Sequence, residues 1–281
     1  MYNIRLCWAK GNGAKPDNNV KNWYLMMTMN RQDNAMNDSE CHLSQWGDKV
    51  FLSLWSHPNL FRKDRHSNKE ICDLLAIFDD TAIIFSLKDI GFGDGAPEQV
   101  LWNRWHNKAI KKSIGAINGA LRHLSENPDN VFSDKECTSA IIQDIQNIKK
   151  LHKVSVSFGC PKNLKVVYSK EPQESSSVYE VSLPSDDPVH VFNEKALEVI
   201  QSDIDTVRDF CSYLEEKESL IKRVDTLEYN CESDLLARFF LGYDEEKNKY
   251  GFNESDNDVS IAEDEWHRFS KMEEYDRRKL A

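Results

Sequence analysis

The stretch KEICDLLAIFDDTAIIFSLKD, residues 69–89, constrains the fold of this chain more than any other. It contains two apolar runs separated by the acidic pair Asp79–Asp80, and two such runs around a turn signal predict a β-hairpin. Both runs are continuously apolar rather than alternating, which is typical of strands covered on both faces. The sequence therefore predicts a central hairpin in an α/β fold, with other elements packed on each side of it.

Polar residues interrupt the apolar runs at one end of this hairpin. Asp73 lies in the first run, and Ser86 and Lys88 lie in the second. A two-residue turn at Asp79–Asp80 places Asp73 opposite Ser86, and a turn shifted by one residue places it opposite Lys88. Side chains alternate along a strand, so either register puts the three residues on one face. Because isolated buried charges are costly, the arrangement is either a structural ion pair or a functional site.

This pattern resembles the core of the PD-(D/E)XK nuclease superfamily, in which an Asp on one strand is followed, after a hairpin, by an acid-x-Lys motif on the next. Asp73 stands at the Asp position, Lys88 at the Lys position, and Ser86 where the family has its second acid. The resemblance implies a mixed β-sheet flanked by helices in the order αβββαβ. It also implies metal-dependent hydrolysis of phosphodiester bonds, with bacterial restriction or anti-phage defence as a frequent setting.

The acid that is missing at Ser86 has to be supplied by another residue, since a metal nuclease needs at least two carboxylates around its cation. Glu70 and Glu40 are the candidates, with Glu70 favoured because it is close to Asp73 in the chain. Glu70 lies an odd number of positions from Asp73, so it reaches the same face only if the strand bulges or begins after it. Glu40 lies in the first turn of a predicted helix, where an acid also interacts favourably with the helix dipole.

The resemblance assigns a role to each of these positions. Asp73, Glu70 and the main-chain carbonyl of Leu87 would hold Mg²⁺ or Mn²⁺. Lys88 would orient or deprotonate the attacking water, or stabilise the charge that develops on the phosphate. The expected catalytic residues are therefore Asp73, Lys88, Glu70 and Glu40.

Two predicted helices flank the hairpin. Apolar residues follow Ser39 at helical spacing as far as Leu54, just before the hairpin. The second helix spans about 98–126 and has isoleucine and leucine along one face. On its opposite side lies a stripe of five cations without an acid, called here the basic stripe: Arg104, Lys108, Lys111, Lys112 and Arg122. The basic stripe is either an ordinary solvated face or a surface that follows a nucleic-acid backbone, with DNA the expected partner.

Charge and composition limit these interpretations. The net charge of −11 is unfavourable for a dedicated nucleic-acid binder unless the charge is segregated along the chain. The odd count of seven cysteines and the lack of a CxxC pair argue against both a disulfide framework and a zinc site, and they fit a reducing cytosol. No segment approaches the ~18 apolar residues that a membrane helix needs, and the stretch MYNIRLCWAK lacks the apolar run of a signal peptide. A cytoplasmic protein with no membrane contact is expected.

The expected organisation is a nuclease-like core over 39–170 behind an N-terminal extension, 1–38. A helical C-terminal region over 189–243 and a charged tail or docking helix over 244–281 follow. One long, strongly acidic helix is predicted from Asn193, and such a helix repels phosphate and favours a protein partner. Together with Ser86, it supports an alternative function: a catalytically silent nuclease-like fold that acts as a protein-interaction subunit.

Overall fold

A computed structural model describes residues 37–141, 145–171, 177–204, 206–246, 248–273 and 275, with backbone alone for 52–54 and 146. Nearly all of the expected N-terminal extension lies outside these residues. The described part of the chain is mixed α/β, with two mixed β-sheets flanked by helices. None of its helices is both long enough and apolar enough to cross a membrane.

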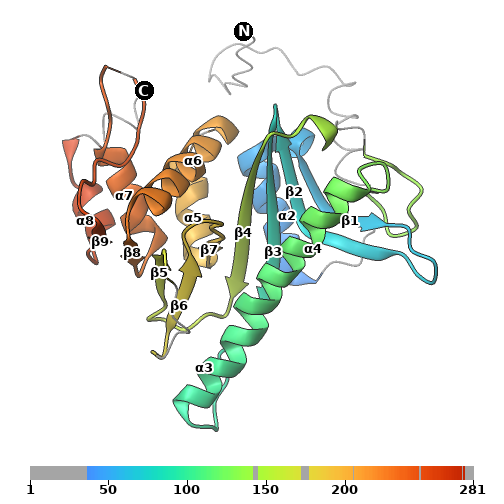
Figure 1. The fold of residues 1–281 in the computed structure, drawn as a ribbon, viewed down its shortest axis with the longest axis horizontal. Coiled ribbons are helices and arrows are strands. Elements are labelled where there is room, and N and C mark those ends of the chain that lie inside the picture. The colour runs from blue at the N-terminus through green and yellow to red at the C-terminus, as the bar shows by residue number, and fades with distance from the viewer. Residues whose placement is uncertain are drawn as a thin grey trace, which may run out of the picture. The chain divides into compact units, whose positions relative to one another are not determined.

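The first sheet contains the predicted hairpin at its centre (Figure 1). Its strand order is β1-β2-β3-β4-β7, with antiparallel pairing from β1 to β3 and parallel pairing from β3 to β7. Its strands are β1 (Ser56–Arg62), β2 (Lys69–Phe78), β3 (Thr81–Asp89), β4 (Lys150–Phe158) and β7 (His190–Phe192). Because β3 and β4 are parallel, the chain has to cross from the end of β3 to the start of β4. The segment between the two strands contains the helix that makes this crossover.

The turn of the hairpin has the first of the two predicted registers. Phe78 pairs with Thr81, and the antiparallel pairing of β2 with β3 continues to Leu74 and Phe85. Asp79 has a φ of 55°, in the left-handed region that Asp tolerates better than most residues. The predicted turn at Asp79–Asp80 is therefore confirmed, and it fixes which side chains share a face.

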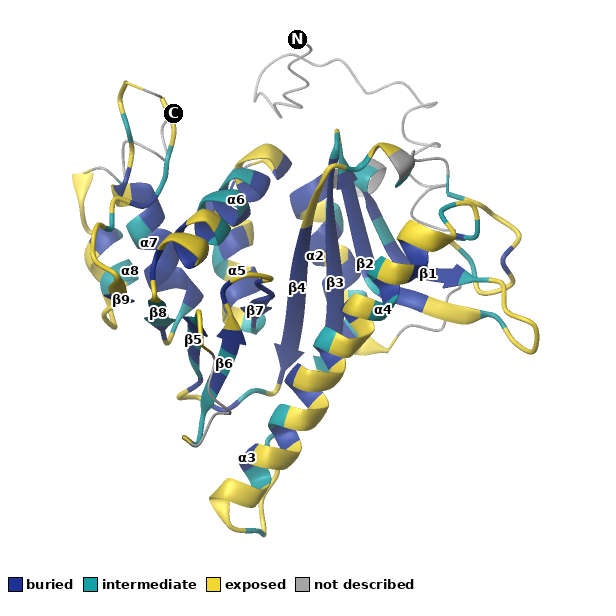
Figure 2. Cartoon of the chain, viewed as in Figure 1, coloured by how far each residue is buried: buried dark blue, intermediate teal, exposed yellow. Residues whose placement is uncertain are grey.

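Helices cover both faces of the first sheet, as the continuously apolar strands require (Figure 2). Helix α2 (Asp38–Trp55) buries Trp46 and Phe51 against Phe85 on one face. On the other face, α4 (Lys112–Glu126) buries Ile117 and Leu124 beside the strands. The α4 helix continues from α3 (Glu98–His106) through a π-helical turn, η1 (Asn107–Lys111). The predicted helix over 98–126 is thus present, with a wider turn in its middle.

The second sheet corrects the expectation of a purely helical C-terminal extension. Its strand order is β6-β5-β8-β9. The strands are β5 (Lys165–Ser169), β6 (Glu180–Pro184), β8 (Thr226–Tyr229) and β9 (Asp258–Ser260). Each has five residues or fewer, too few for a clear alternating pattern. The two sheets do not divide at residue 170, because β5 belongs to the second sheet while the later β7 joins the first.

The predicted acidic helix is two helices, α5 (Glu194–Asp203) and α6 (Val207–Arg223). Thr206 accepts a hydrogen bond from the Asp209 N–H and so starts α6 within the apolar periodicity. Further along are α7 (Glu232–Leu241) and α8 (Glu265–Phe269), and a 3₁₀ turn, η2 (Ile145–Asn147), precedes β4. Phe269 of α8 is buried against Phe240 of α7, so part of the charged region beyond 244 packs as a helix.

Candidate functional site

A β-bulge in β2 decides which residues face the proposed site. Leu60 of β1 pairs with Cys72, and the next residue, Phe61, pairs with Glu70, so Ile71 is an extra residue in β2. The extra residue changes the alternation, which brings Glu70 to the face that carries Asp73. The condition under which Glu70 can serve as the second acid is therefore met.

A small pocket forms where these residues meet. It has a volume of about 130 Å³ and lies on the face of the sheet that α4 covers, with Ala116 and Ile117 along its helical side. Its polar lining comes from β2 and β3: Glu70, Asp73, Ser86 and Lys88. The structure thus brings together three of the four predicted catalytic residues.

Asp73 and Lys88 are linked through the backbone of Leu87. The Leu87 N–H donates to Asp73 Oδ2 at 2.7 Å, and Lys88 Nζ donates to the Leu87 carbonyl at 2.9 Å. Lys88 Nζ lies 4.0 Å from Asp73 Oδ2, and both side chains are only partly buried. The Asp73 carboxylate is therefore oriented by the strand that carries the lysine, and the Leu87 carbonyl faces the ammonium.

Electrostatic crowding is strongest at Glu70. Burial of its carboxyl group, followed by the negative charges of Asp73 and Glu40, raises the pKa of Glu70 to about 7, although Lys88 opposes the shift. Two carboxylates thus disfavour the ionisation of Glu70, and Lys88 favours it. A divalent cation would relieve this repulsion, so the donor set fits a hard, oxygen-binding cation such as Mg²⁺ or Mn²⁺.

Glu40 is already engaged at the start of α2. Its carboxylate accepts hydrogen bonds from Asn37 N at 3.1 Å and Asn37 Nδ2 at 2.8 Å, and Asn37 Oδ1 caps the Glu40 N–H. This is a capping box, the helix-end role that was the alternative for this acid. Glu40 is close enough to raise the pKa of Glu70, but Glu70 is the acid that lines the pocket.

Ser86 is fully buried, and its hydroxyl has no hydrogen-bond partner among the described residues. Its carbonyl accepts a hydrogen bond from Ser113 Oγ of α4 at 3.1 Å, which ties the helix to this position. Buried polar atoms are usually satisfied, often by water or a ligand. The Ser86 hydroxyl lines the pocket beside Asp73, so a water or ligand bound there would supply its missing hydrogen bond.

All five residues of the basic stripe are exposed, and none forms an ion pair with a described residue. The π-helical turn contains both Lys108 and Lys111, so the stripe does not have the angles of an unbroken α-helix. This turn lets the buried tryptophans of α3 and Ile117 of α4 both face the protein. Lys112 lies one helical turn before Ala116, at the wall of the pocket.

Several acids of α6 pair with cations or histidines of the same chain, mostly at the surface. Glu215 pairs with Lys150 at 2.7 Å, and Glu216 pairs with Lys249 at 2.8 Å. Glu218 accepts from His152, also at 2.7 Å. These contacts reduce the negative charge that is free to attract a protein partner.

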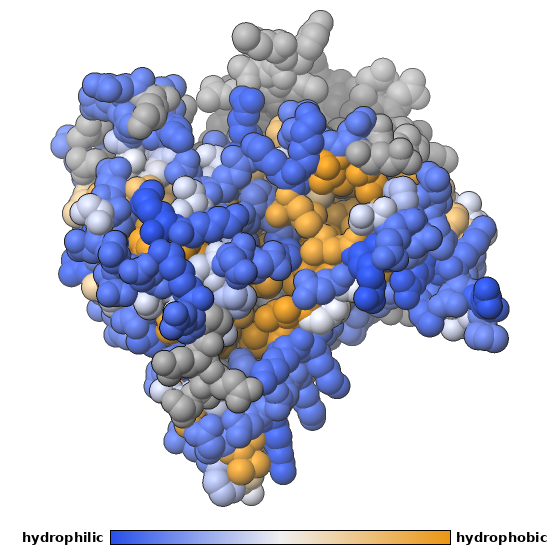
Figure 3. Space-filling view, viewed as in Figure 1, coloured by the Kyte–Doolittle hydropathy of each residue, from blue (hydrophilic) through white to orange (hydrophobic). Residues whose placement is uncertain are grey.

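Two further features were not predicted from the sequence. An apolar pocket of about 480 Å³ lies beside α4, where Figure 3 shows hydrophobic residues near the middle of the view, but its only charged lining residue is Lys149. A cluster of two histidines and a glutamate, His152, His190 and Glu218, lies on the opposite face of the first sheet from α4. Its members are far apart in the chain, so no local spacing indicates them. No family model, curated protein or solved structure significantly matches this chain.

Proposed function

We propose that this protein is a metal-dependent nuclease of the PD-(D/E)XK type that hydrolyses phosphodiester bonds in nucleic acid, with DNA as the expected substrate. The observation that carries the proposal is the bulge at Ile71, which places Glu70 beside Asp73 and Lys88 in one pocket. The order of elements supports it, because α2, β1, β2, β3, the α3–α4 helix and β4 follow one another as αβββαβ.

Asp73, Glu70 and the Leu87 carbonyl would hold Mg²⁺ or Mn²⁺, which keeps most of its waters when bound by few protein oxygens. When bound, the cation supplies Lewis-acid stabilisation of the phosphate and a more acidic water. Binding would also favour the ionised form of Glu70, whose pKa is raised by burial and, to a smaller extent, by Asp73 and Glu40.

Residues of the protein would orient the metal-binding carboxylate and stabilise the charge that develops on the phosphate. The Leu87 N–H holds the Asp73 carboxylate in one position, which limits the reorganisation needed when a substrate arrives. Lys88 has an exposed part and can turn from the Leu87 carbonyl toward a phosphate oxygen, where its charge stabilises the developing negative charge. The Ser86 hydroxyl can donate to or accept from a water in the pocket.

The basic stripe would bind the phosphate backbone near the pocket, since Lys112 is one turn from its wall. The net charge of −11 is an average over the chain, whereas the stripe is a local group of five exposed cations that carries no ion pair with the described residues. The alternative, a silent interaction subunit, is supported by Ser86 at the position of an acid, but the paired acids of α6 weaken it.

The test compares Asp73→Asn and Lys88→Met with the wild type on single-stranded and duplex DNA and RNA in Mg²⁺ and in Mn²⁺. We expect both variants to lose cleavage by at least ~100-fold while still binding nucleic acid, because electrostatic and metal contributions of this kind are worth several kcal/mol. Asp129→Asn and Lys135→Ala, at exposed positions elsewhere, are the matched controls. The proposal is refuted if the wild type cleaves none of these substrates, or if both site variants cleave them as fast as the wild type does.

A further inference from the structure

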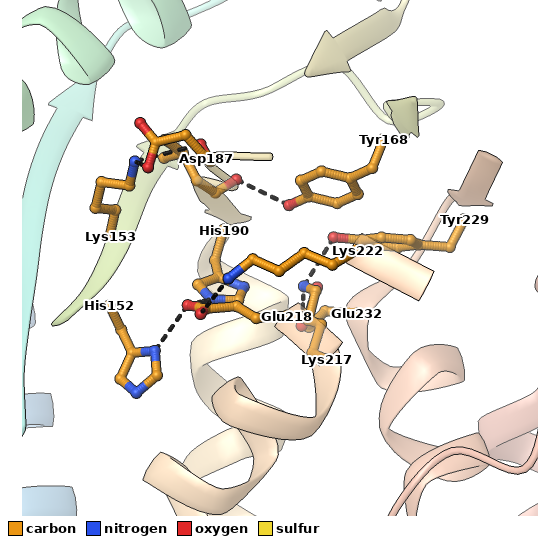
Figure 4. A network of polar contacts seen from close by, with 11 residues as sticks. His152, Lys153, Tyr168, Asp187, His190, Lys217, Glu218, Lys222, Tyr229 and Glu232 are labelled. Carbon is orange, nitrogen blue, oxygen red and sulfur yellow. Dashed lines mark hydrogen bonds and ion pairs between the residues drawn. The ribbon is translucent and has the colours of Figure 1, made fainter. Parts of the chain in front are cut away.

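His152 of β4, His190 of β7 and Glu218 of α6 converge beneath the first sheet (Figure 4). His152 Nδ1 lies 2.7 Å from Glu218 Oε1, and His190 Nε2 lies 3.2 Å from the same oxygen. The three ligand atoms all lie within 4.8 Å of one another. Both imidazoles are buried, so packing within the sheet holds the rings in place.

The donor set and spacing fit a tetrahedral first-row transition metal. Two imidazoles and one carboxylate are a known set of zinc ligands, and Zn–N and Zn–O bonds of about 2.0–2.2 Å place tetrahedral donors about 3.3 Å apart. The separation of 3.2 Å at His190 already has this value, and the separation of 2.7 Å at His152 has to open by about half an ångström. A rotation of the Glu218 side chain on α6 would move its carboxylate away from His152, and the two histidine nitrogens, within 4.8 Å of each other, would have to approach the same spacing.

Each ring is free to take the tautomer that coordination needs. His152 Nε2 and His190 Nδ1 are buried and have no hydrogen-bond partner among the described residues. The tautomer of a histidine is normally set by the bond that its other nitrogen makes, and here no second bond opposes moving the proton away from the Glu218 side. The lack of second-shell partners also lowers the expected affinity, because such partners typically contribute about 10–100-fold each.

The cluster has a route to solvent. His152 and Glu218 line an open pocket of about 700 Å³, together with Lys150, Glu215 and Lys222. Lys222 Nζ lies 3.9 Å from Glu218 Oε2 on a half-exposed side chain that can swing into water. A metal held by three protein ligands would therefore keep a fourth position that faces this pocket, as in zinc sites that retain a water.

We propose that His152, His190 and Glu218 form a second metal site, distinct from the Asp73 pocket, which binds one Zn²⁺ or a similar first-row transition metal. The site joins β4 and β7 of the first sheet to α6, so metal binding stabilises the folded chain. It prefers transition metals to Mg²⁺, because imidazole nitrogen suits zinc and cobalt better than it suits a hard cation.

The experiment titrates Co²⁺ and Zn²⁺ into the full chain after treatment with EDTA. We expect one Co²⁺ per chain at the cluster with the intense visible bands of a four-coordinate site, displaced by Zn²⁺, and a thermal midpoint that rises with metal concentration. Glu218→Gln and His152→Gln should each weaken Co²⁺ binding by more than ~100-fold, since removal of a ligand should exceed the loss of a second-shell partner. Lys222→Ala should strengthen binding severalfold, because it removes a competing positive charge.

Two controls separate this site from its surroundings. Glu215→Gln changes an acid of the same pocket that is not a ligand, and Asp73→Asn removes the other proposed metal site; both should keep the four-coordinate spectrum. If the ligand variants fail to fold, wild-type crystals are soaked in Zn²⁺ instead. Anomalous scattering at the zinc edge then shows whether zinc occupies the cluster. The proposal is overturned if the wild type shows neither the four-coordinate Co²⁺ spectrum nor the anomalous zinc peak. It is also overturned if folded ligand variants bind Co²⁺ as tightly as the wild type.

Discussion

The ion pair between Lys217 of α6 and Glu232 of α7 offers a quantitative test of how the two sheets are held together. Lys217 Nζ lies 2.7 Å from Glu232 Oε1, and the two side chains are 0% and 3% exposed. Lys217 also donates to the Tyr229 hydroxyl at 2.9 Å, and the Tyr213 hydroxyl donates to Glu232 at 2.6 Å. Figure 4 shows Lys217 beside Glu232 and Tyr229, so each charge of the pair has an opposite charge in contact with it.

The surroundings of Lys217 show why its charge needs a partner. Its Nζ lies 4.9 Å from the ring centroid of Tyr229 in the second sheet and 5.4 Å from that of Phe192 in the first. Burial lowers the pKa of Lys217, and the charge of Glu232 opposes that shift. The ammonium therefore lies between the sheets, where water cannot replace a lost carboxylate.

Replacing one partner should be costly, and replacing both should be much less so. Lys217→Met or Glu232→Gln alone leaves a buried charge unpaired, which costs about 3–5 kcal/mol of unfolding free energy. For a chain of this size that corresponds to a fall in thermal midpoint of roughly 6–20 °C. In the double variant, the new amide oxygen at position 232 still accepts from Tyr213. The buried N–H groups of that amide then need an acceptor, and the Tyr229 hydroxyl loses Lys217 as a donor while it keeps its hydrogen bond with Tyr168. Leaving such groups unpaired costs about 1–3 kcal/mol.

Equilibrium unfolding in urea, followed by far-UV circular dichroism, measures all four proteins of this double-mutant cycle. The coupling should exceed ~2 kcal/mol in favour of the double variant, well above the ~0.5 kcal/mol within which distant sites are additive. Additive losses, or single variants that lose less than ~1 kcal/mol, would refute the view that this pair is a matched buried charge.

Two predictions concern the proposed nuclease site. Glu70→Gln should abolish Mn²⁺ binding measured by calorimetry, whereas Glu40→Gln should weaken it only slightly and change stability little, because Gln can also complete the capping box; the reverse order of metal binding would contradict the assignment. Charge reversal in the basic stripe should weaken DNA binding strongly at low salt and reduce its salt dependence, with stability changed by less than ~0.5 kcal/mol per site. This variant carries Glu at Lys108, Lys111 and Lys112. Its matched control carries Glu at three exposed lysines elsewhere, Lys49, Lys135 and Lys195, and equal loss in both would contradict a specific surface.

The sequence predicted the centre of the fold well because that centre is built from local signals. Two apolar runs around Asp79–Asp80 determine a hairpin, and its register follows from the turn. The flanking helices have enough turns for their apolar spacing to be clear. The shared face of Asp73, Ser86 and Lys88 follows from the hairpin alone, so these residues could be placed in one pocket in advance.

Other features depend on contacts that no local pattern records. The strands of the second sheet are short, and their pairing brings together segments separated by loops and helices. The π-helical turn is a compromise between the packing of α3 and that of α4, which have different neighbours. His152, His190 and Glu218 meet only after β4, β7 and α6 are assembled, so the spacing of histidines did not indicate them.

The bulge at Ile71 separates the two original interpretations of Asp73 and Lys88. In a regular strand Glu70 would face away, and the two residues would form an ordinary ion pair. The observed pair is poor for that purpose, because its charges are 4.0 Å apart and partly exposed, and such pairs contribute little to stability. Meanwhile the bulge brings a second carboxylate, Glu70, to the face that carries Asp73, where the charge of Asp73 disfavours its ionisation and raises its pKa further than burial alone. A structural role explains neither the weak pair nor the added acid, whereas a site that binds a cation explains both.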